Sequence, residues 1–169
     1  MPDDPRSVRT DDHRAGAGPL VVLYGDVTCP RCQEATRRLR SAPVTLVWRH
    51  LVLRARGPRP RALACALEAA ARQAAFWPLL DRLLADPART DDPDLWRIAG
   101  ELGLDVGRLD ADRRDDEATR RVGADLSEAL GLGAVGTPAI LAGDGPVDHG
   151  VPDDAWIAAL IGSAPPAPG

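Results

Sequence analysis

The chain has 169 residues, enough for one domain with a full hydrophobic core, and a mild net charge of −4. All of its basic residues are arginines, scattered rather than gathered in one run, so neither nucleic acid nor an anionic membrane surface is an expected partner. The first apolar segment, residues 19–25, is also far too short to span a membrane.

The two ends of the chain are polar and rich in proline. Residues 1–18 contain four aspartates and no apolar run that could form the core of a secretory signal. We expect them to form a disordered lead of a cytoplasmic protein. Residues 163–169, "SAPPAPG", predict a flexible tail for the same compositional reason.

The first folded segments predict a strand, a helix and a second strand. "PLVVLYG" at residues 19–25 and "VTLVWRHLVL" at 44–53 are β-branched and apolar, as buried strands are. Between them, residues 29–41 follow a helical pattern with Thr28 as the candidate N-cap. If the two strands are parallel, this is a right-handed βαβ unit.

A helical block and a final β-β-α segment follow. Residues 61–130 carry apolar residues at three- and four-residue steps and predict roughly four helices. After them, "AILAG" and "PVDHG", separated by "GDG", predict a hairpin, and residues 151–162 predict the last helix. This order indicates an α/β, thioredoxin-like fold (β-α-β … β-β-α) with an inserted all-helical domain. Its parts are a first half at 19–60, the insertion at 61–132 and a second half at 133–162.

Cys29 and Cys32 lie where the first strand passes into the first helix. A cysteine at a helix N-terminus faces free backbone N–H groups and the positive end of the helix dipole, which stabilise a thiolate. Cys29 is therefore the predicted nucleophile, and Cys32, nearly one turn further on, the predicted resolving thiol. Pro30 and Arg31 stand between them, and the charge of Arg31 is expected to lower the pKa of Cys29 further.

Two other readings of the cysteine pair are open. The spacing could be accidental, or the pair could be half of a zinc site. A structural zinc site usually needs four ligands, but the sequence has no second Cys-X-X-Cys, and His13, His50 and His149 are isolated. We therefore expect neither a metal nor another cofactor.

The remaining candidates have mainly structural interpretations. Cys65, in an alanine-rich helical segment, is expected to be a small core residue. His50 follows an apolar strand and could either line the active-site face or serve the structure. The four tryptophans fall in apolar patterns and are expected in the core: Trp48, Trp77, Trp96 and Trp156.

Pro138, in "VGTPAI", leads into the predicted third strand. A proline at the start of a strand supplies no N–H to the sheet, so its position needs a reason. A cis bond after Thr137 would provide one, because X-Pro is the linkage in which the cis form costs little.

Taken together, "YGDVTCPRC", "VWRHLVL", "ALACALEAAARQAAFWPLLDRLL", "ELGLD" and "GLGAVGTPAI" resemble the DsbA-like branch of the thioredoxin superfamily, including thioredoxin-like domains fused to some sodium/proton antiporters. The resemblance implies that Cys29 attacks, Cys32 resolves, and the backbone of Thr137 in a cis-proline loop pairs with an extended substrate. Many relatives carry a buried acid six positions before the first cysteine. This chain has Leu23 there, so proton transfer at Cys32 must use water, Asp26 or nothing, and slower thiol exchange than in those relatives is expected.

The predicted function is a thiol–disulfide oxidoreductase. Its partners would be a protein or small-molecule thiol or disulfide substrate and a redox partner of unknown identity. Pro30 and Arg31 favour an oxidising pair and the absence of an export signal favours a reducing compartment, so the direction is open. The alternatives are a non-catalytic thioredoxin-like binding module and a glutathione-dependent transferase or isomerase.

Overall fold

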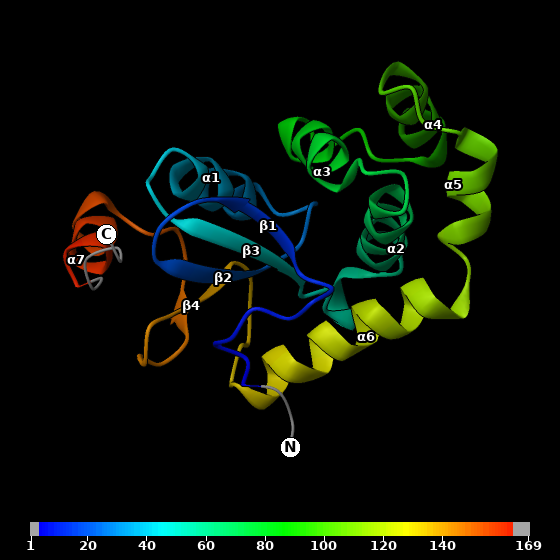
Figure 1. Cartoon of the computed structure of the whole chain (residues 1–169). Helices are drawn as coiled ribbons and strands as arrows, with labels where there is room; N and C mark the ends of the chain where they lie inside the picture. The colour runs from blue at the N-terminus through cyan, green and yellow to red at the C-terminus, as the bar shows by residue number, and fades with distance from the viewer. Residues whose placement is uncertain (1–3, 164–169) are drawn as a thin grey trace.

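A mixed five-stranded sheet organises residues 4–163, the part of the chain that the computed structural model describes (Figure 1). The strand order is β1-β3-β2-β4-β5. The two central strands, β2 and β3, are parallel, and the other pairs are antiparallel. The strands are β1 (His13–Gly16), β2 (Leu20–Gly25), β3 (Thr45–His50), β4 (Ala139–Ala142) and β5 (Asp148–His149).

Helices connect and cover this sheet. α1 (Pro30–Arg40) crosses from β2 to β3 and completes the predicted βαβ unit, and α7 (Asp154–Gly162) ends the described chain. Between β3 and β4 lie η1 (Arg54–Arg56), α2 (Arg59–Ala71), α3 (Phe76–Ala85), α4 (Asp92–Glu101), α5 (Val106–Asp112) and α6 (Asp116–Gly131). This block has five α-helices rather than about four, because Asp105 caps a short additional helix, α5. No helix among the described residues is long and apolar enough to cross a membrane.

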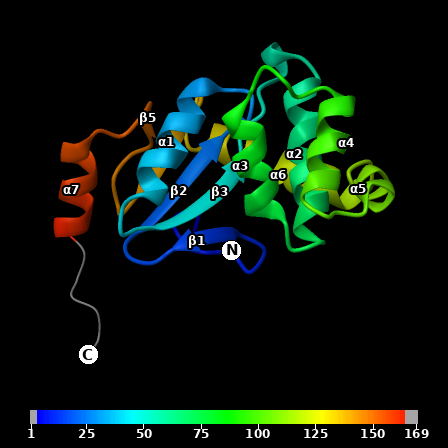
Figure 2. The ribbon, with the colours of Figure 1, turned by 90° about the horizontal axis from the view of Figure 1, so that it is seen from above.

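The two faces of the sheet pack against different helices. Val21 and Leu23 of β2 belong to the large core shared with α1, α2 and α3. Val22 and Tyr24, which alternate with them, belong to a second core on the opposite face, shared with α6. Figure 2 shows α7 at one side of the sheet and α4 and α5 at the other.

Gly25 ends β2 at the point where the chain turns toward α1. A Cβ atom here would lie 2.4 Å from the ring of Trp48, so only glycine fits beside this buried tryptophan. The close approach brings the end of β2 against β3, and Leu51 N–H donates to the carbonyl of Gly25 at 2.9 Å. The residues that follow Gly25 carry the cysteine pair.

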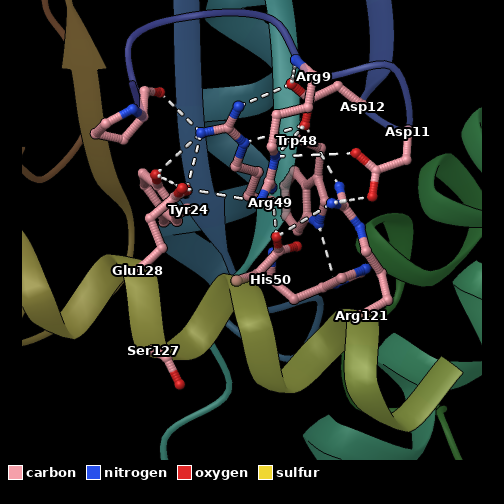
Figure 3. Close-up of polar contacts among 12 residues, drawn as sticks. Arg9, Asp11, Asp12, Tyr24, Trp48, Arg49, His50, Arg121, Ser127 and Glu128 are labelled. Atoms are coloured by element: carbon pink, nitrogen blue, oxygen red, sulfur yellow. Dashed lines mark hydrogen bonds and ion pairs between the residues drawn. The ribbon is translucent and has the colours of Figure 1, made fainter. Parts of the chain in front are cut away.

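The N-terminal segment corrects the expectation of a disordered lead. Within residues 4–18, the chain forms β1 and packs its charged side chains against β3 and α6 (Figure 3). Fully buried Arg49 binds Asp12 and Glu128, each at 2.8 Å, and Arg9 binds Asp125 at 2.6 Å. Buried ion pairs of this kind require good geometry and further hydrogen bonds. Arg49 obtains them from the carbonyls of residues 5 and 7.

The tryptophans and the C-terminal tail differ in part from the sequence expectation. Among the tryptophans, only Trp48 is fully buried; Trp77, Trp96 and Trp156 are half-buried and cover the edge of the core. The ring N–H groups of Trp77 and Trp156 explain why these two side chains are not fully buried. Trp77 donates to the carbonyl of Arg14, and Trp156 donates to Asp148 near the surface. Residues 164–169 of the predicted flexible tail lie outside the described residues, while Ser163 caps the C-terminus of α7.

Candidate active site

Cys29 and Cys32 lie at the N-terminus of α1, both as free thiols. Cys29 is the N-cap residue, 5% exposed, and Cys32 in the first turn is fully buried. The predicted N-cap, Thr28, lies one residue too early. Its N–H and hydroxyl both donate to Asp26 Oδ1, at 2.8 and 2.7 Å, and so fix the turn before the helix.

The two thiols have pKa values displaced in opposite directions. A hydrogen bond from the Cys32 thiol, with support from Thr137 and from the backbone N–H groups of Arg31 and Cys32, lowers the pKa of Cys29 to about 5 against the effect of burial. The same hydrogen bond and burial raise the pKa of Cys32. At neutral pH Cys29 is therefore a thiolate, ready to attack, while Cys32 keeps its proton.

Arg31 contributes to this thiolate through its backbone. Its N–H helps to lower the pKa of Cys29, as expected at a helix N-terminus. The exposed guanidinium lies against Gly150, where an added Cβ would come within 2.7 Å of Arg31 Nη2. Pro30 occupies the first helical position, where its missing N–H costs nothing.

Thr137 and Pro138 lie opposite the thiols. Their peptide bond is cis, as the sequence predicted. The carbonyl oxygen of Thr137 is 3.7 Å from Cys29 Sγ, and the carbonyl of Pro138 accepts a hydrogen bond from Gly150 N–H at 3.0 Å. The tertiary structure thus brings together two segments that are 108 residues apart. Next to them Val135 is 80% exposed, so the loop is open to solvent at this side.

Asp26 is the acidic residue in contact with the resolving thiol. Its backbone N–H lies 3.5 Å from Cys32 Sγ, and the residue is only 1% exposed. The Oδ2 atom of this carboxylate has no hydrogen-bond partner among the described residues and is approached by Arg56 Nε at 3.5 Å. Leu23 is fully buried among apolar residues. The backbone of an acidic residue, Asp26, thus lies against Cys32.

His50 and Cys65 serve the structure. His50 Nε2 contacts Glu68 at 2.7 Å, and its backbone N–H donates to Asp125 at 2.9 Å. Glu68 also contacts His13, so it links β1, β3 and α2. Cys65 is buried with Val52 and residues of α6, and burial raises its pKa, as suits an unreactive core thiol.

A metal centre has no donor set in the part of the chain that the structure describes. No three His, Cys, Asp or Glu side chains there are arranged to hold an ion. The cysteine pair contacts the carbonyl of Thr137 and the backbone N–H of Asp26.

Comparison with known families agrees with this geometry. The family described as DSBA-like thioredoxin domain matches residues 58–159, which include the helical block and the cis-proline loop. The chain belongs to this family. The cysteine pair lies before the matched segment, so its assignment rests on the sequence pattern and on the site geometry.

Solved structures and curated relatives extend the comparison. The chain is similar to a thioredoxin-like oxidoreductase from Silicibacter pomeroyi DSS-3, with a TM-score of 0.81, 25% identity, and coverage of 91% of this chain and 92% of that one. It is also similar to Pseudomonas aeruginosa DsbA2, with a TM-score of 0.74, 27% identity, and coverage of 92% and 95%.

Among curated relatives, Na(+)/H(+) antiporter NhaA 3 of Salinispora tropica is 37% identical over 135 residues. The match covers 75% of this chain but only 21% of that protein. NhaA 1 of Salinispora arenicola is 34% identical, with 90% of this chain and 24% of the relative covered. The chain thus spans about a quarter or less of these relatives.

Proposed function

We propose that this protein is a thiol–disulfide oxidoreductase that uses Cys29 as nucleophile and Cys32 as resolving thiol. The observation that carries the proposal is the opposite displacement of two thiol pKa values at one helix N-terminus, with the Thr137 carbonyl 3.7 Å from the nucleophile. Such a pair has one sulfur ready to attack and one that reacts only after the first is consumed.

In the reducing direction, the Cys29 thiolate attacks one sulfur of a substrate disulfide. The Cys29–substrate bond forms, the substrate disulfide breaks, and the departing substrate thiolate takes a proton from solvent. Cys32 then loses its proton, attacks Cys29 Sγ and displaces the second substrate thiolate. Two electrons pass from the cysteine pair to the substrate, and the Cys29–Cys32 disulfide remains.

Asp26 supports the second step of this cycle. Forming the mixed disulfide removes the negative charge from Cys29, and Cys32 must then become a thiolate in a buried site. Asp26 contacts Cys32 Sγ through its backbone N–H, and its buried carboxylate has an Oδ2 atom without a hydrogen bond, so we assign the uptake of that proton to this carboxylate. Arg56, 41% exposed, connects this carboxylate to solvent.

The pKa of Cys29 favours net oxidation of substrate dithiols. A nucleophile with a pKa of about 5 stabilises the reduced pair, which makes the Cys29–Cys32 disulfide a stronger oxidant. In that direction the steps above run in reverse, and an unidentified redox partner must accept electrons from the reduced pair. A cytoplasmic location stays a prediction from the sequence.

Insulin reduction and oxidation of a dithiol peptide test the proposal together. The wild-type protein should be active, whereas Cys29→Ser should be inactive and Cys32→Ser should accumulate a mixed disulfide. Equal, negligible activity of all three proteins would contradict the proposal. Equilibration with glutathione should also give a potential less negative than about −270 mV, the value typical of thioredoxin.

A further inference from the structure

Two arginines close in sequence to functional segments of the site, Arg31 and Arg54, are among the six in residues 4–163 that form no ion pair; the others are Arg6, Arg14, Arg61 and Arg120. Most arginines of the described residues bind a carboxylate, as Arg9, Arg49 and Arg121 do in the N-terminal network. Arg31 and Arg54 are exposed, and neither has a carboxylate within ion-pair distance among residues 4–163. A chain with a net charge of −4 thus leaves the cation of Arg31, two residues from Cys29, without an ion pair.

These arginines belong to two segments next to the cysteine pair. In one segment, Arg54 opens the short turn η1, and Arg56 ends it beside Asp26, the residue that contacts Cys32. In the other, the guanidinium of Arg31 lies over Gly150, whose N–H binds the carbonyl of Pro138. A substrate segment that lies along the cis-proline loop therefore meets the guanidinium of Arg31 at Gly150, while Arg54 and Arg56 add positive charge to the segment beside Asp26. We call Arg31, Arg54 and Arg56 the basic rim.

The acidic side chains of Asp26, Asp148 and Asp153 form no ion pair with Arg31 or Arg54 among residues 4–163. Asp26 is buried and faces Arg56. Asp153 caps α7 by accepting from Trp156 N–H, and Asp148 accepts from the Trp156 ring at 2.8 Å. Neither lies within ion-pair distance of Arg31, so these two exposed carboxylates leave its guanidinium free.

We propose that the substrate carries carboxylates beside its reactive disulfide or dithiol, either in an acidic polypeptide segment or in a small acidic thiol. The proposal rests on the oxidoreductase function and adds the class of substrate. Guanidinium groups bind carboxylates through paired hydrogen bonds, and opposite charge around a site steers partners toward it. The preference should appear in the rate of encounter and weaken as salt rises.

Three matched peptide disulfides, with glutamate, glutamine or lysine next to each cysteine, test this. Mixing each with the reduced protein at low ionic strength gives second-order rate constants. The acidic peptide should react about tenfold faster than the neutral one, and the basic peptide more slowly than either. At about 1 M salt, where charges are screened beyond about 3 Å, the three rates should converge.

Variants locate the effect. The double variant Arg31→Gln/Arg54→Gln should bring the ratio of acidic to neutral rates close to one; a ratio cancels changes in the intrinsic reactivity of Cys29. Arg120→Gln is the matched control. Arg120 is likewise exposed and without a carboxylate partner in residues 4–163, but it lines a hollow between α2, α6 and the N-terminal segment. This control should keep the wild-type ratio.

Failures of the two proposals can be told apart. If the wild-type protein reacts with no disulfide, the oxidoreductase proposal fails. If it reacts equally with all three peptides, or if Arg120→Gln lowers the ratio as much as the double variant, only the basic rim is overturned. Glutathione disulfide forms a fourth arm. A rim-dependent enhancement there supports a small acidic thiol, and an enhancement confined to the peptide supports an acidic polypeptide.

Discussion

Replacing Cys32 with alanine removes the hydrogen bond that contributes most to the low pKa of Cys29. The backbone N–H groups of the first helical turn remain, so part of the depression should persist. Cys32→Ser is the matched control, because its hydroxyl keeps a donor at the same position. We expect the pKa of Cys29 to rise in the alanine variant and to stay low in the serine variant.

The magnitude follows from the strength of a hydrogen bond to a charged group. Such a bond contributes about 1.5–3 kcal/mol, and one pKa unit corresponds to about 1.36 kcal/mol. The alanine variant should therefore have a Cys29 pKa of about 6–7, compared with about 5 in the wild-type protein. At pH 6, the thiolate fraction would fall from about 90% to about 10–50%.

The pH dependence of iodoacetamide alkylation measures this change. Reduced protein is labelled across the pH range, and modification of Cys29 is followed by mass spectrometry, with buried Cys65 as an internal unreactive thiol. Alkylation of Cys32→Ala at pH 6 should be about 2–10 times slower than that of the wild-type protein, with equal rates at high pH. An unchanged inflection near pH 5 would falsify the argument and assign the low pKa to the helix N-terminus alone.

Three other changes test the N-terminal network and the proton route. Burial opposes ionisation of Asp12, but hydrogen bonds from Arg49 lower its pKa to about 2. The ionised carboxylate therefore stabilises the folded protein above about pH 4, and this contribution is lost as the pH falls toward 2. Urea unfolding should therefore find Asp12→Asn less stable by about 2 kcal/mol at pH 7, with no difference near pH 2. Deleting residues 1–12 should lower the free energy of unfolding by about 3–5 kcal/mol, because buried Arg49 loses its partner Asp12. A thermal midpoint equal to that of the full chain would show that this segment does not stabilise the fold, as expected of a disordered lead. Asp26→Asn should slow release of substrate from the mixed disulfide by about 10²-fold at neutral pH and by less at high pH, as measured by stopped flow, and a wild-type rate would assign the proton transfer to water.

The part of the fold nearest the cysteines could be predicted because local patterns specify it. β2 and β3 follow from short β-branched apolar runs, and α1 follows from helical spacing after a cysteine and a proline. These signals lie within a few residues of the features that they predict. The cis bond before Pro138 needs more, because a proline where a strand begins is a weak signal alone and becomes a strong one only after the helical block and before a hairpin.

The N-terminal segment could not be predicted in this way. Its aspartates and arginines have the composition of a disordered tail. Nothing nearby in the sequence shows that Asp12 pairs with buried Arg49 or that Arg9 pairs with buried Asp125, because these partners lie far away along the chain. The position of the Arg31 side chain is a similar case. The sequence shows an arginine two residues after Cys29, but not that the guanidinium of Arg31 lies over Gly150.

The sequence by itself thus determined the thioredoxin-like order of strands and helices, the two thiols and the proline that faces them, because these depend on hydrophobic period and on residues with special backbone chemistry. Only the tertiary structure decided which charges are satisfied and which remain free. Ion pairs join residues far apart in the chain, and an arginine has the same sequence signature whether it is buried with a carboxylate, as Arg49 is, or exposed beside the reactive sulfur, as Arg31 is.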